Sequence, residues 1–358
     1  MTYVLGVRRG DVASIHSDSQ LTQLTGEIGY ESVKNGILFP GCIFGLAGDW
    51  EPGLRFIETV RRAVEHLEIL ADKWSMFGRV CAAYDAGQSE FDVLVSSRIT
   101  GKPAFFLYQS QSKQLRSAEG NFYQLGSGKA LYEGVATNFA NNALSGIDRW
   151  SDSEFHYFVH ALLNESLAGE NKTAAAGSGV GGFFTFVLQD SASDARQQPT
   201  LLVHLYANDE DQTVIQHSHR IAFEQHPRIG EVMFYCEKPH GLPPDCMALL
   251  QNVSRFEIPA DAMQDVNKWA QDVMKRGFDT HPYYFMQAKV VQVAYYAPFA
   301  DFRTDDVYFA DLNDYLDDEV FSILMRIHEA GGSTESGWRL AALSAGAGRR
   351  WAARRGSD

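Results

Sequence analysis

Three things are scarce in this sequence: cysteine, long apolar runs and positive charge. The four cysteines are far apart and form no C-x-x-C pair, which excludes a disulfide-rich secreted scaffold and predicts reduced, buried thiols. No stretch approaches the ~18 apolar residues of a membrane-spanning helix, and charge comes too early for a signal peptide. With 31 Lys and Arg against 45 Asp and Glu, the net charge is −14, which argues against nucleic acid as a partner. We therefore expect a cytoplasmic protein with no membrane and no nucleic-acid partner.

What is present is a chain of ordinary globular composition. Its 358 residues are 45% hydrophobic and 21% charged, which is enough for two domains. Residues 3–9 and 12–16 predict a hairpin that turns at Gly10. Further β-structure is expected over residues 37–47, a run that Pro40-Gly41 interrupts, and over residues 91–99, 103–109, 183–189 and 200–207. Helices are expected over residues 54–67, 129–144 and 153–167. Because the strands come in contiguous groups, the order favours an α+β fold of stacked antiparallel sheets with helices outside.

The sequence pattern changes after residue 222, where Pro239, Pro243 and Pro244 interrupt the regular strand and helix patterns. Helices are expected over residues 261–275 and 317–330. From Gly331 the sequence is rich in Gly, Ala, Ser and Arg, which is typical of a disordered tail. We therefore divide the chain into a first domain, residues 1–222, an α/β extension of unknown role, residues 223–330, and a tail, residues 331–358.

Two sequence motifs have the letters of a cofactor or metal site without its context. Residues 177–182 match G-x-G-x-x-G, but they follow a helix and precede a strand, the reverse of a dinucleotide-binding loop. His217, His219 and His226 lack the carboxylate or cysteine company of a metal site. We therefore expect no metal and no organic cofactor.

The strongest chemical signal lies at the start of the chain. Met1 is followed by the small residue Thr2, and removal of Met1 would give Thr2 a free α-amine beside its own hydroxyl. That amine has a reference pKa of about 7.7–8.0, so it can act as the base that a hydroxyl nucleophile needs. The alternative is an ordinary second residue with Met1 retained or acetylated.

Three further residues fit the same chemistry. A buried Lys34 near Thr2 would lower the proton affinity of the amine by like-charge repulsion. Asp18 would hold and pair that lysine, and Gly48 could offer a backbone N–H to an oxyanion. Taken singly, Asp18 is a strand-end residue, Lys34 a solvated charge and Gly48 a tight turn.

At these positions the sequence resembles a family. The segment Thr2-Tyr-Val-Leu-Gly-Val-Arg-Arg9 is similar to the mature start of proteasome β subunits and bacterial proteasome-like peptidases, which are N-terminal nucleophile hydrolases. Asp18, Lys34 and Gly48 fall at the family's spacing. Ser127 lies in a similar Gly-Ser-Gly, and the run from Val180 to Gly182 resembles the family's late Gly-Gly before a strand. The resemblance covers roughly residues 2–222 and implies a four-layer αββα sandwich.

The resemblance also implies an activity and partners. It implies a threonine-type peptidase or amidase acting on peptides or unfolded proteins, with Thr2, Asp18, Lys34, Gly48 and Ser127 as catalytic residues. Leu46 and Trp50 would lie near the substrate pocket. A ring-forming homo-oligomer with inward-facing sites is implied, and an AAA+ ATPase unfoldase is a candidate partner.

The sequence departs from the family in two respects, one of which is that the residues beyond 222 have no counterpart in a bare β-type subunit. Many members carry an Asp and a Ser shortly before the late Gly-Gly, where this chain has Gly177 and Val180. Two alternatives therefore stay open: a catalytically inactive scaffold or interaction subunit of the same fold, and a small-molecule amidase of the wider superfamily.

Overall fold

The structure is a computed structural model, and the chain divides into two units. It describes residues 2–22, 28–129, 152, 155, 156, 159, 160, 163, 180–190, 195–198, 200–207, 214–226, 230–238, 245–250, 260–279, 290–296 and 338–344. One unit comprises Met1–Gln197 with Leu250–Ile258, and the other comprises Gln198–Leu249 with Pro259–Asp358. The predicted boundary at residue 222 falls inside strand β14 (Val214–His226), so the division lies earlier in the chain, at Gln197.

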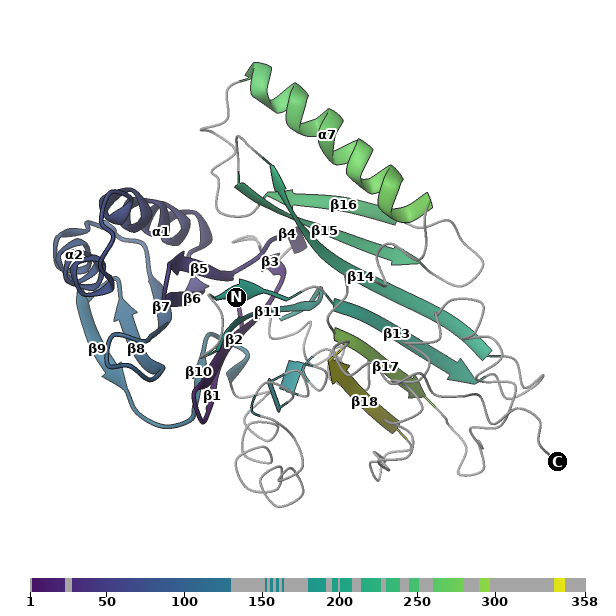
Figure 1. The fold of residues 1–358 in the computed structure, drawn as a ribbon, viewed down its shortest axis with the longest axis horizontal. Coiled ribbons are helices and arrows are strands. Elements are labelled where there is room, and N and C mark those ends of the chain that lie inside the picture. The colour runs from purple at the N-terminus through teal and green to yellow at the C-terminus, as the bar shows by residue number, and fades with distance from the viewer. Residues whose placement is uncertain are drawn as a thin grey trace. The chain divides into compact units, whose positions relative to one another are not determined.

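The first unit contains a five-stranded sheet in the order β10-β1-β2-β11-β12 (Figure 1). Its strands are β1 (Val4–Arg9), β2 (Val12–Asp18), β10 (Phe122–Leu125), β11 (Phe184–Gln189) and β12 (Arg196–Gln197). The predicted hairpin is confirmed, since Arg9 pairs with Val12. Gly10 has φ +57° at this turn, a conformation that residues with a Cβ adopt only at a cost.

A second five-stranded sheet has the order β5-β6-β7-β8-β9. Its strands are β5 (Asn35–Phe39), β6 (Cys42–Gly48), β7 (Phe91–Ser97), β8 (Ala104–Gln109) and β9 (Gln114–Ala118). The apolar run over residues 37–47 forms two strands, and the chain turns back at Pro40 and Gly41, where the sequence interrupts that run. A separate two-stranded sheet pairs β3 (Gln20–Thr22) with β4 (Ile28–Glu31).

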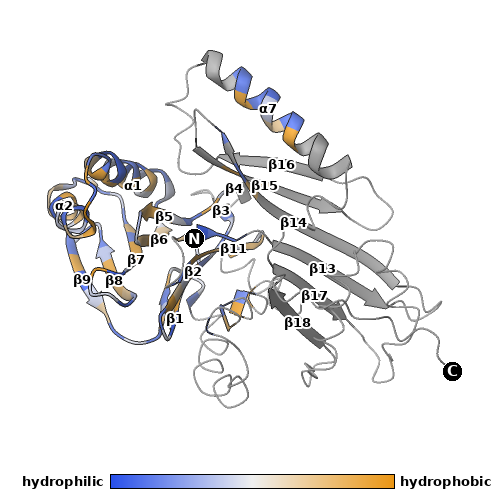
Figure 2. Ribbon diagram, in the orientation of Figure 1, coloured by the Kyte–Doolittle hydropathy of each residue, from blue (hydrophilic) through white to orange (hydrophobic). Residues whose placement is uncertain are grey.

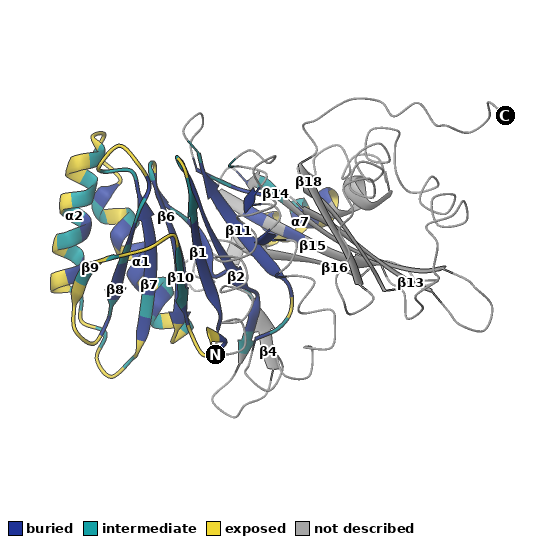
Figure 3. Ribbon diagram, turned by 90° about the horizontal axis from the view of Figure 1, so that it is seen from below, coloured by how far each residue is buried: buried dark blue, intermediate teal, exposed yellow. Residues whose placement is uncertain are grey.

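Two helices pack against the second sheet. The predicted helix is confirmed as α1 (Trp50–Val64), whose apolar stripe buries Phe56, Ile57 and Val60. The helix α2 (Leu70–Ala83) was not predicted; it buries Phe77 and Cys81 in the same apolar cluster. Figures 2 and 3 show the apolar, buried sides of these helices turned toward the sheet and their polar, exposed sides turned away.

The two sheets pack face to face over a second apolar cluster. It joins the first sheet to β6, β7 and β8 through Val4, Ala13, Ile15, Ile43, Leu94 and Phe105. The sheets approach closely at Gly45, where a Cβ would lie 2.6 Å from side-chain atoms of both Ile15 and Val4. The opposite face of the first sheet meets described helical positions, since Ser14 Oγ lies 2.6 Å from His156 Nδ1.

The second unit contains a six-stranded sheet in the order β16-β15-β14-β13-β17-β18. Its further strands are β13 (Thr200–Ala207), β15 (Gly230–Lys238), β16 (Asp245–Leu250), β17 (Val290–Tyr296) and β18 (Trp338–Ser344). Strand β18 pairs antiparallel with β17, which corrects the prediction of a disordered tail over these residues.

A helix of this second unit packs on its sheet. The helix α7 (Ala260–Asp279) confirms the helix expected over residues 261–275. Its Trp269 ring contacts Phe234 of β15 and His226 of β14. Among the helices that the structure describes, none combines the length and apolar character needed to cross a membrane.

Candidate active site

The site begins where β1 starts, beside the turn that follows β10. The Thr2 backbone nitrogen donates to Ser127 Oγ at 3.3 Å, and Gly128 N–H donates to the Thr2 carbonyl at 3.4 Å. Gly126 has φ +87°, and a Cβ there would lie 1.9 Å from the backbone carbonyl oxygen of Thr2. This turn therefore needs glycine, and it holds Ser127 against the Thr2 nitrogen.

Asp18, at the end of β2, fixes the residue that follows Thr2. The Tyr3 N–H donates to Asp18 Oδ1 at 2.9 Å, and the Asp18 N–H donates to the Tyr3 carbonyl at 3.3 Å. The Tyr3 hydroxyl also donates to Gln124 Oε1 at 2.9 Å. These contacts set the direction in which the chain leaves Thr2.

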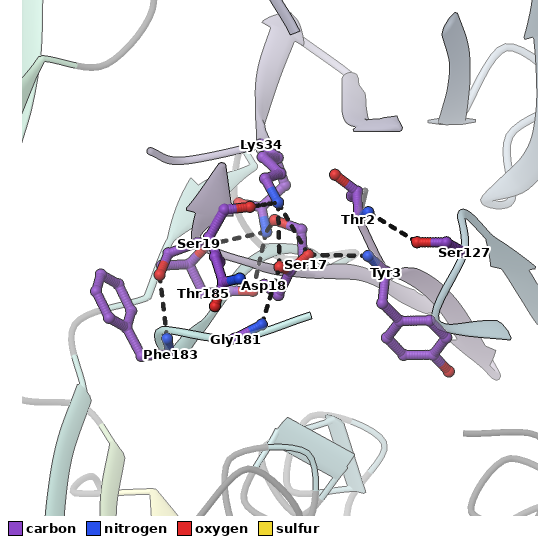
Figure 4. A network of polar contacts seen from close by, with 12 residues as sticks. Thr2, Tyr3, Ser17, Asp18, Ser19, Lys34, Ser127, Gly181, Phe183 and Thr185 are labelled. Carbon is purple, nitrogen blue, oxygen red and sulfur yellow. Dashed lines mark hydrogen bonds and ion pairs between the residues drawn. The ribbon is translucent and has the colours of Figure 1, made fainter. Parts of the chain in front are cut away.

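Lys34 meets Asp18 in the interior, as the sequence predicts. Lys34 Nζ lies 3.1 Å from both carboxylate oxygens of Asp18 and also donates to the Gln20 carbonyl. The side chains of Lys34 and Asp18 are 1% and 0% exposed. Figure 4 places Thr2 beside this ion pair, with Ser127 on its other side.

Burial shifts both groups of the ion pair toward their neutral forms. Desolvation raises the pKa of Asp18, and the nearby Lys34 charge only partly opposes that shift. Desolvation likewise lowers the pKa of Lys34, opposed by Asp18. The Asp18 carboxylate opposes the loss of the Lys34 proton, and only the charged form of Lys34 can repel a proton from a neighbouring amine.

Asp18 also accepts a hydrogen bond from a segment that is distant in sequence. The Gly181 N–H donates to Asp18 Oδ2 at 3.4 Å. A Cβ at Gly181 would lie 1.8 Å from Gln20 Oε1, so this close approach needs glycine. The predicted Gly-Gly before a strand is confirmed, because Gly181 and Gly182 precede β11.

Gly48 ends β6 on the side of the sheet where Lys34 lies. Its φ is +96°, and a Cβ there would lie 2.4 Å from the Glu90 carbonyl oxygen. The Leu46 N–H donates to the Lys34 carbonyl at 2.7 Å. Successive N–H groups of a strand alternate in direction, so the Gly48 N–H points to the same edge as that of Leu46. This orientation suits an oxyanion donor near Lys34.

The two residues expected near a substrate pocket lie around the start of α1. Leu46 is buried, and its side chain packs against Gly53 in the cluster beneath α1. Trp50 is the first residue of α1 and is half-buried against the same cluster. Their contribution to substrate binding stays a prediction.

The family's Asp and Ser positions are only partly described. Gly177 lies outside the described residues. Val180 is fully buried, and its Cγ2 lies 2.5 Å from the point where a Gly128 Cβ would stand. An apolar side chain therefore fills the space beside the turn that carries Ser127.

Two polar networks were missed by sequence reasoning. Asn35 forms buried hydrogen bonds that cross between the sheets. On the outer face of the first sheet, Ser14 Oγ also contacts His16 Nε2 at 2.7 Å, and the ring of His16 stacks on that of His160. His156 and His160 share a helix face at i, i+4, and that spacing was the available signal. In the part of the chain that the structure describes, no group of three or more His, Cys, Asp or Glu residues could hold a metal ion.

Comparisons with known proteins give likenesses to solved structures and to nothing else. No protein-family model and no curated protein matches the sequence. Among solved structures, the chain is similar to eukaryotic HslV from Trypanosoma brucei, with a TM-score of 0.39 and 14% sequence identity. The match covers 53% of this chain and 99% of that chain. A likeness of this size says nothing about the reaction.

Proposed function

We propose that this protein is an N-terminal threonine hydrolase of the proteasome-like type, a peptidase or amidase with Thr2 as its nucleophile. One observation carries the proposal. The Thr2 nitrogen lies against Ser127 Oγ while the next N–H, that of Tyr3, is bound by the Asp18 carboxylate of a buried ion pair. Removal of Met1 would therefore leave the Thr2 amine next to the residue whose N–H is bound by this ion pair.

Removal of Met1 frees the amine that acts as the base. The Thr2 amine takes the proton of the Thr2 hydroxyl through a water molecule, and Oγ attacks the carbonyl carbon of the substrate. The positive charge of Lys34 keeps the amine unprotonated near neutral pH and stabilises the developing alkoxide. Asp18 keeps Lys34 in place, and Ser127 orients the amine.

The remaining steps follow acyl-transfer chemistry. The Gly48 N–H stabilises the negative oxygen of the tetrahedral intermediate. The Thr2 amine, now protonated, gives its proton to the leaving amine, and an ester forms between Thr2 Oγ and the acyl group. Water then attacks the ester and releases the acid, which restores the free hydroxyl.

The finer features of the family belong to the same proposal. The described helical positions between residues 152 and 163 would complete a second helical layer, giving a four-layer αββα sandwich. The substrates would be peptides or unfolded proteins, with Leu46 and Trp50 near the pocket. The assembly would be a homo-oligomeric ring in the cytoplasm, served by an AAA+ ATPase unfoldase.

Intact mass and a matched pair of variants test the proposal. Mass spectrometry of the expressed protein is expected to find Met1 removed; retention would refute the mechanism, because the amine would then belong to the wrong residue. Thr2→Ala is expected to abolish hydrolysis of fluorogenic peptides and labelling by a threonine-directed epoxyketone. Thr2→Ser, which keeps a hydroxyl, is the control and should retain both. Turnover that survives Thr2→Ala would contradict the site assignment.

A second candidate is an inactive scaffold of the same fold, and Val180 is the observation that favours it. A buried valine supplies no hydrogen bond where many family members carry a serine beside the N-terminus. An inactive scaffold would show neither peptide turnover nor epoxyketone labelling, even with Met1 removed. A small-molecule amidase, the third alternative, would label at Thr2 and hydrolyse small amides but not peptides.

A further inference from the structure

A single buried amide joins the two sheets next to the ion pair. Asn35, the first residue of β5, is 1% exposed. Its Nδ2 donates to Ser17 Oγ at 2.8 Å, to the Thr185 carbonyl at 2.9 Å and to Thr185 Oγ1 at 3.1 Å. Because β5 belongs to one sheet while Ser17 and Thr185 lie in β2 and β11 of the other, these bonds cross the interface between the sheets.

The orientation of the Asn35 amide follows from its partners. A backbone carbonyl can only accept, so the amide nitrogen must face Thr185. The amide oxygen faces the other way and accepts from Gln197 Nε2 at 3.0 Å, and the same nitrogen donates to the Asn35 carbonyl at 2.9 Å. Asn35 is therefore held by three strands of the opposite sheet.

The residues joined by this amide are the chain neighbours of the ion pair. Asn35 directly follows Lys34, and Ser17 directly precedes Asp18. Thr185 pairs with Ser17 across the two strands, and Phe184 pairs with Asp18. One side-chain amide thus anchors both strands one residue away from the Lys34–Asp18 contact.

We propose that Asn35 is a positioning residue: its amide fixes β5 against β2 and β11, and so sets the separation of Lys34 Nζ from the Asp18 carboxylate. Asp18 ends β2 in one sheet and Lys34 directly precedes β5 of the other, so a shift of one sheet along the other would change that separation. A hydrogen bond that crosses between sheets resists such sliding, and an apolar contact, which is non-directional, does not.

The kinetic consequences rest on the function proposed above. If β5 shifts relative to β2, Lys34 loses part of its compensation by Asp18 and gives up its proton at lower pH. If activity depends on the Lys34 charge, the alkaline limb of the pH–activity profile would then move to lower pH. Misplacement of a site by about 1 Å costs on the order of 100-fold in rate, so kcat should fall while KM changes little.

The test compares Asn35→Ala with a matched control in the full chain. Ser96→Ala removes another buried hydrogen bond between the sheets, from Ser96 Oγ of β7 to Gln189 Oε1 of β11 at 3.0 Å. Gln189 pairs with Ala13, at the far end of β2 from Asp18. Thermal melts set a temperature at which every variant is folded, and kcat, KM and the pH profile are measured there.

For Asn35→Ala we expect kcat to fall by roughly 10- to 100-fold and the alkaline limb of kcat to move to lower pH. For Ser96→Ala we expect lower thermal stability with unchanged kcat and an unchanged limb. Ser17→Ala, which removes one of the three bonds, should move both quantities in the same direction by less, and it serves if Asn35→Ala does not fold. Equal kcat and pH limbs in the Asn35, Ser17 and Ser96 variants would overturn the proposal.

A readout independent of turnover separates this inference from the proposed function. The pKa of Lys34 is measured by NMR on protein carrying labelled lysine, and it should fall in Asn35→Ala and not in Ser96→Ala. If the wild-type protein has no peptidase activity but the pKa of Lys34 falls as expected, the proposed function fails and the positioning role stands. An unchanged pKa of Lys34 in Asn35→Ala overturns the positioning role whatever the activity.

Discussion

Replacing Asp18 by Asn isolates the energetics of the buried ion pair. The amide has nearly the volume of the carboxylate and can still accept a hydrogen bond from the Tyr3 N–H, so packing is conserved. Lys34, 1% exposed, loses its opposite charge, and the amide nitrogen can no longer accept from Lys34 and the Gly181 N–H as Asp18 Oδ2 does. Removing one partner of a buried pair costs about 3–5 kcal/mol in the free energy of unfolding. For a unit of this size that cost lowers Tm by roughly 6–20 °C.

The pH dependence of this deficit identifies its cause. Burial holds the pKa of Lys34 below its usual value, so below 10.5 the unfolded chain binds more protons at this lysine than the native protein does. Stability therefore rises with pH through this range, and the deficit of Asp18→Asn should shrink between pH 7 and pH 10. Urea unfolding at several pH values measures it.

A double variant supplies the control for the ion pair. Adding Lys34→Met to Asp18→Asn removes the uncompensated charge and should restore stability to within about 1 kcal/mol of the wild type, or raise it above that level, without restoring turnover. A cost of Asp18→Asn below about 1 kcal/mol at pH 7 that did not vary with pH would refute the reasoning, because Lys34 could not then be a buried ammonium held by Asp18.

Two further variants probe the fold around the site. Gly48→Ala places a Cβ 2.4 Å from the Glu90 carbonyl oxygen at φ +96°. It should lower the free energy of unfolding, measured in urea, by more than about 1 kcal/mol and abolish turnover. The control Gly78→Ala, on an open face of α2, should instead raise the free energy of unfolding by about 0.5–1 kcal/mol. Burial lowers the pKa of His160 to about 3, so its stabilising contribution is complete above pH 6.5 and is lost as the pH falls toward 3. His160→Phe should therefore remove about 2 kcal/mol of the stability lost between pH 7 and pH 5, and a loss equal to that of the wild type would contradict this account.

Much of the first unit is predictable because its patterns are local. The β1–β2 hairpin follows from two short β-rich runs around Gly10, and α1 follows from apolar residues at three- and four-residue steps. The helix α2 was missed because its buried stripe is narrow and its N-cap, Ile69, makes no side-chain hydrogen bond. Its start therefore lacks the polar signal that usually marks a helix N-terminus.

The contacts of the candidate site also fall into those that the sequence predicts and those that it does not. The Asp18–Lys34 contact was predictable from spacing, because a resemblance supplied the geometry that links positions 16 residues apart. The bond from Gly181 to Asp18 and the bonds of Asn35 to Thr185 join segments about 150 residues apart in sequence, and no local pattern encodes them. The unit boundary at Gln197 was missed for a similar reason, since β13 pairs in parallel with the distant β17.

Residues near a chain end ordinarily fray, exchange their amide hydrogens quickly and tolerate alteration. Thr2 and Tyr3 behave as interior residues instead, because β1 lies between β10 and β2 and Asp18 bonds the Tyr3 backbone on both its N–H and its carbonyl. Hydrogen exchange at Tyr3 should consequently be as slow as in the middle of a strand. An affinity tag fused upstream of Thr2 would keep the Thr2 nitrogen in a peptide bond, so the proposed mechanism requires the tag to be placed elsewhere.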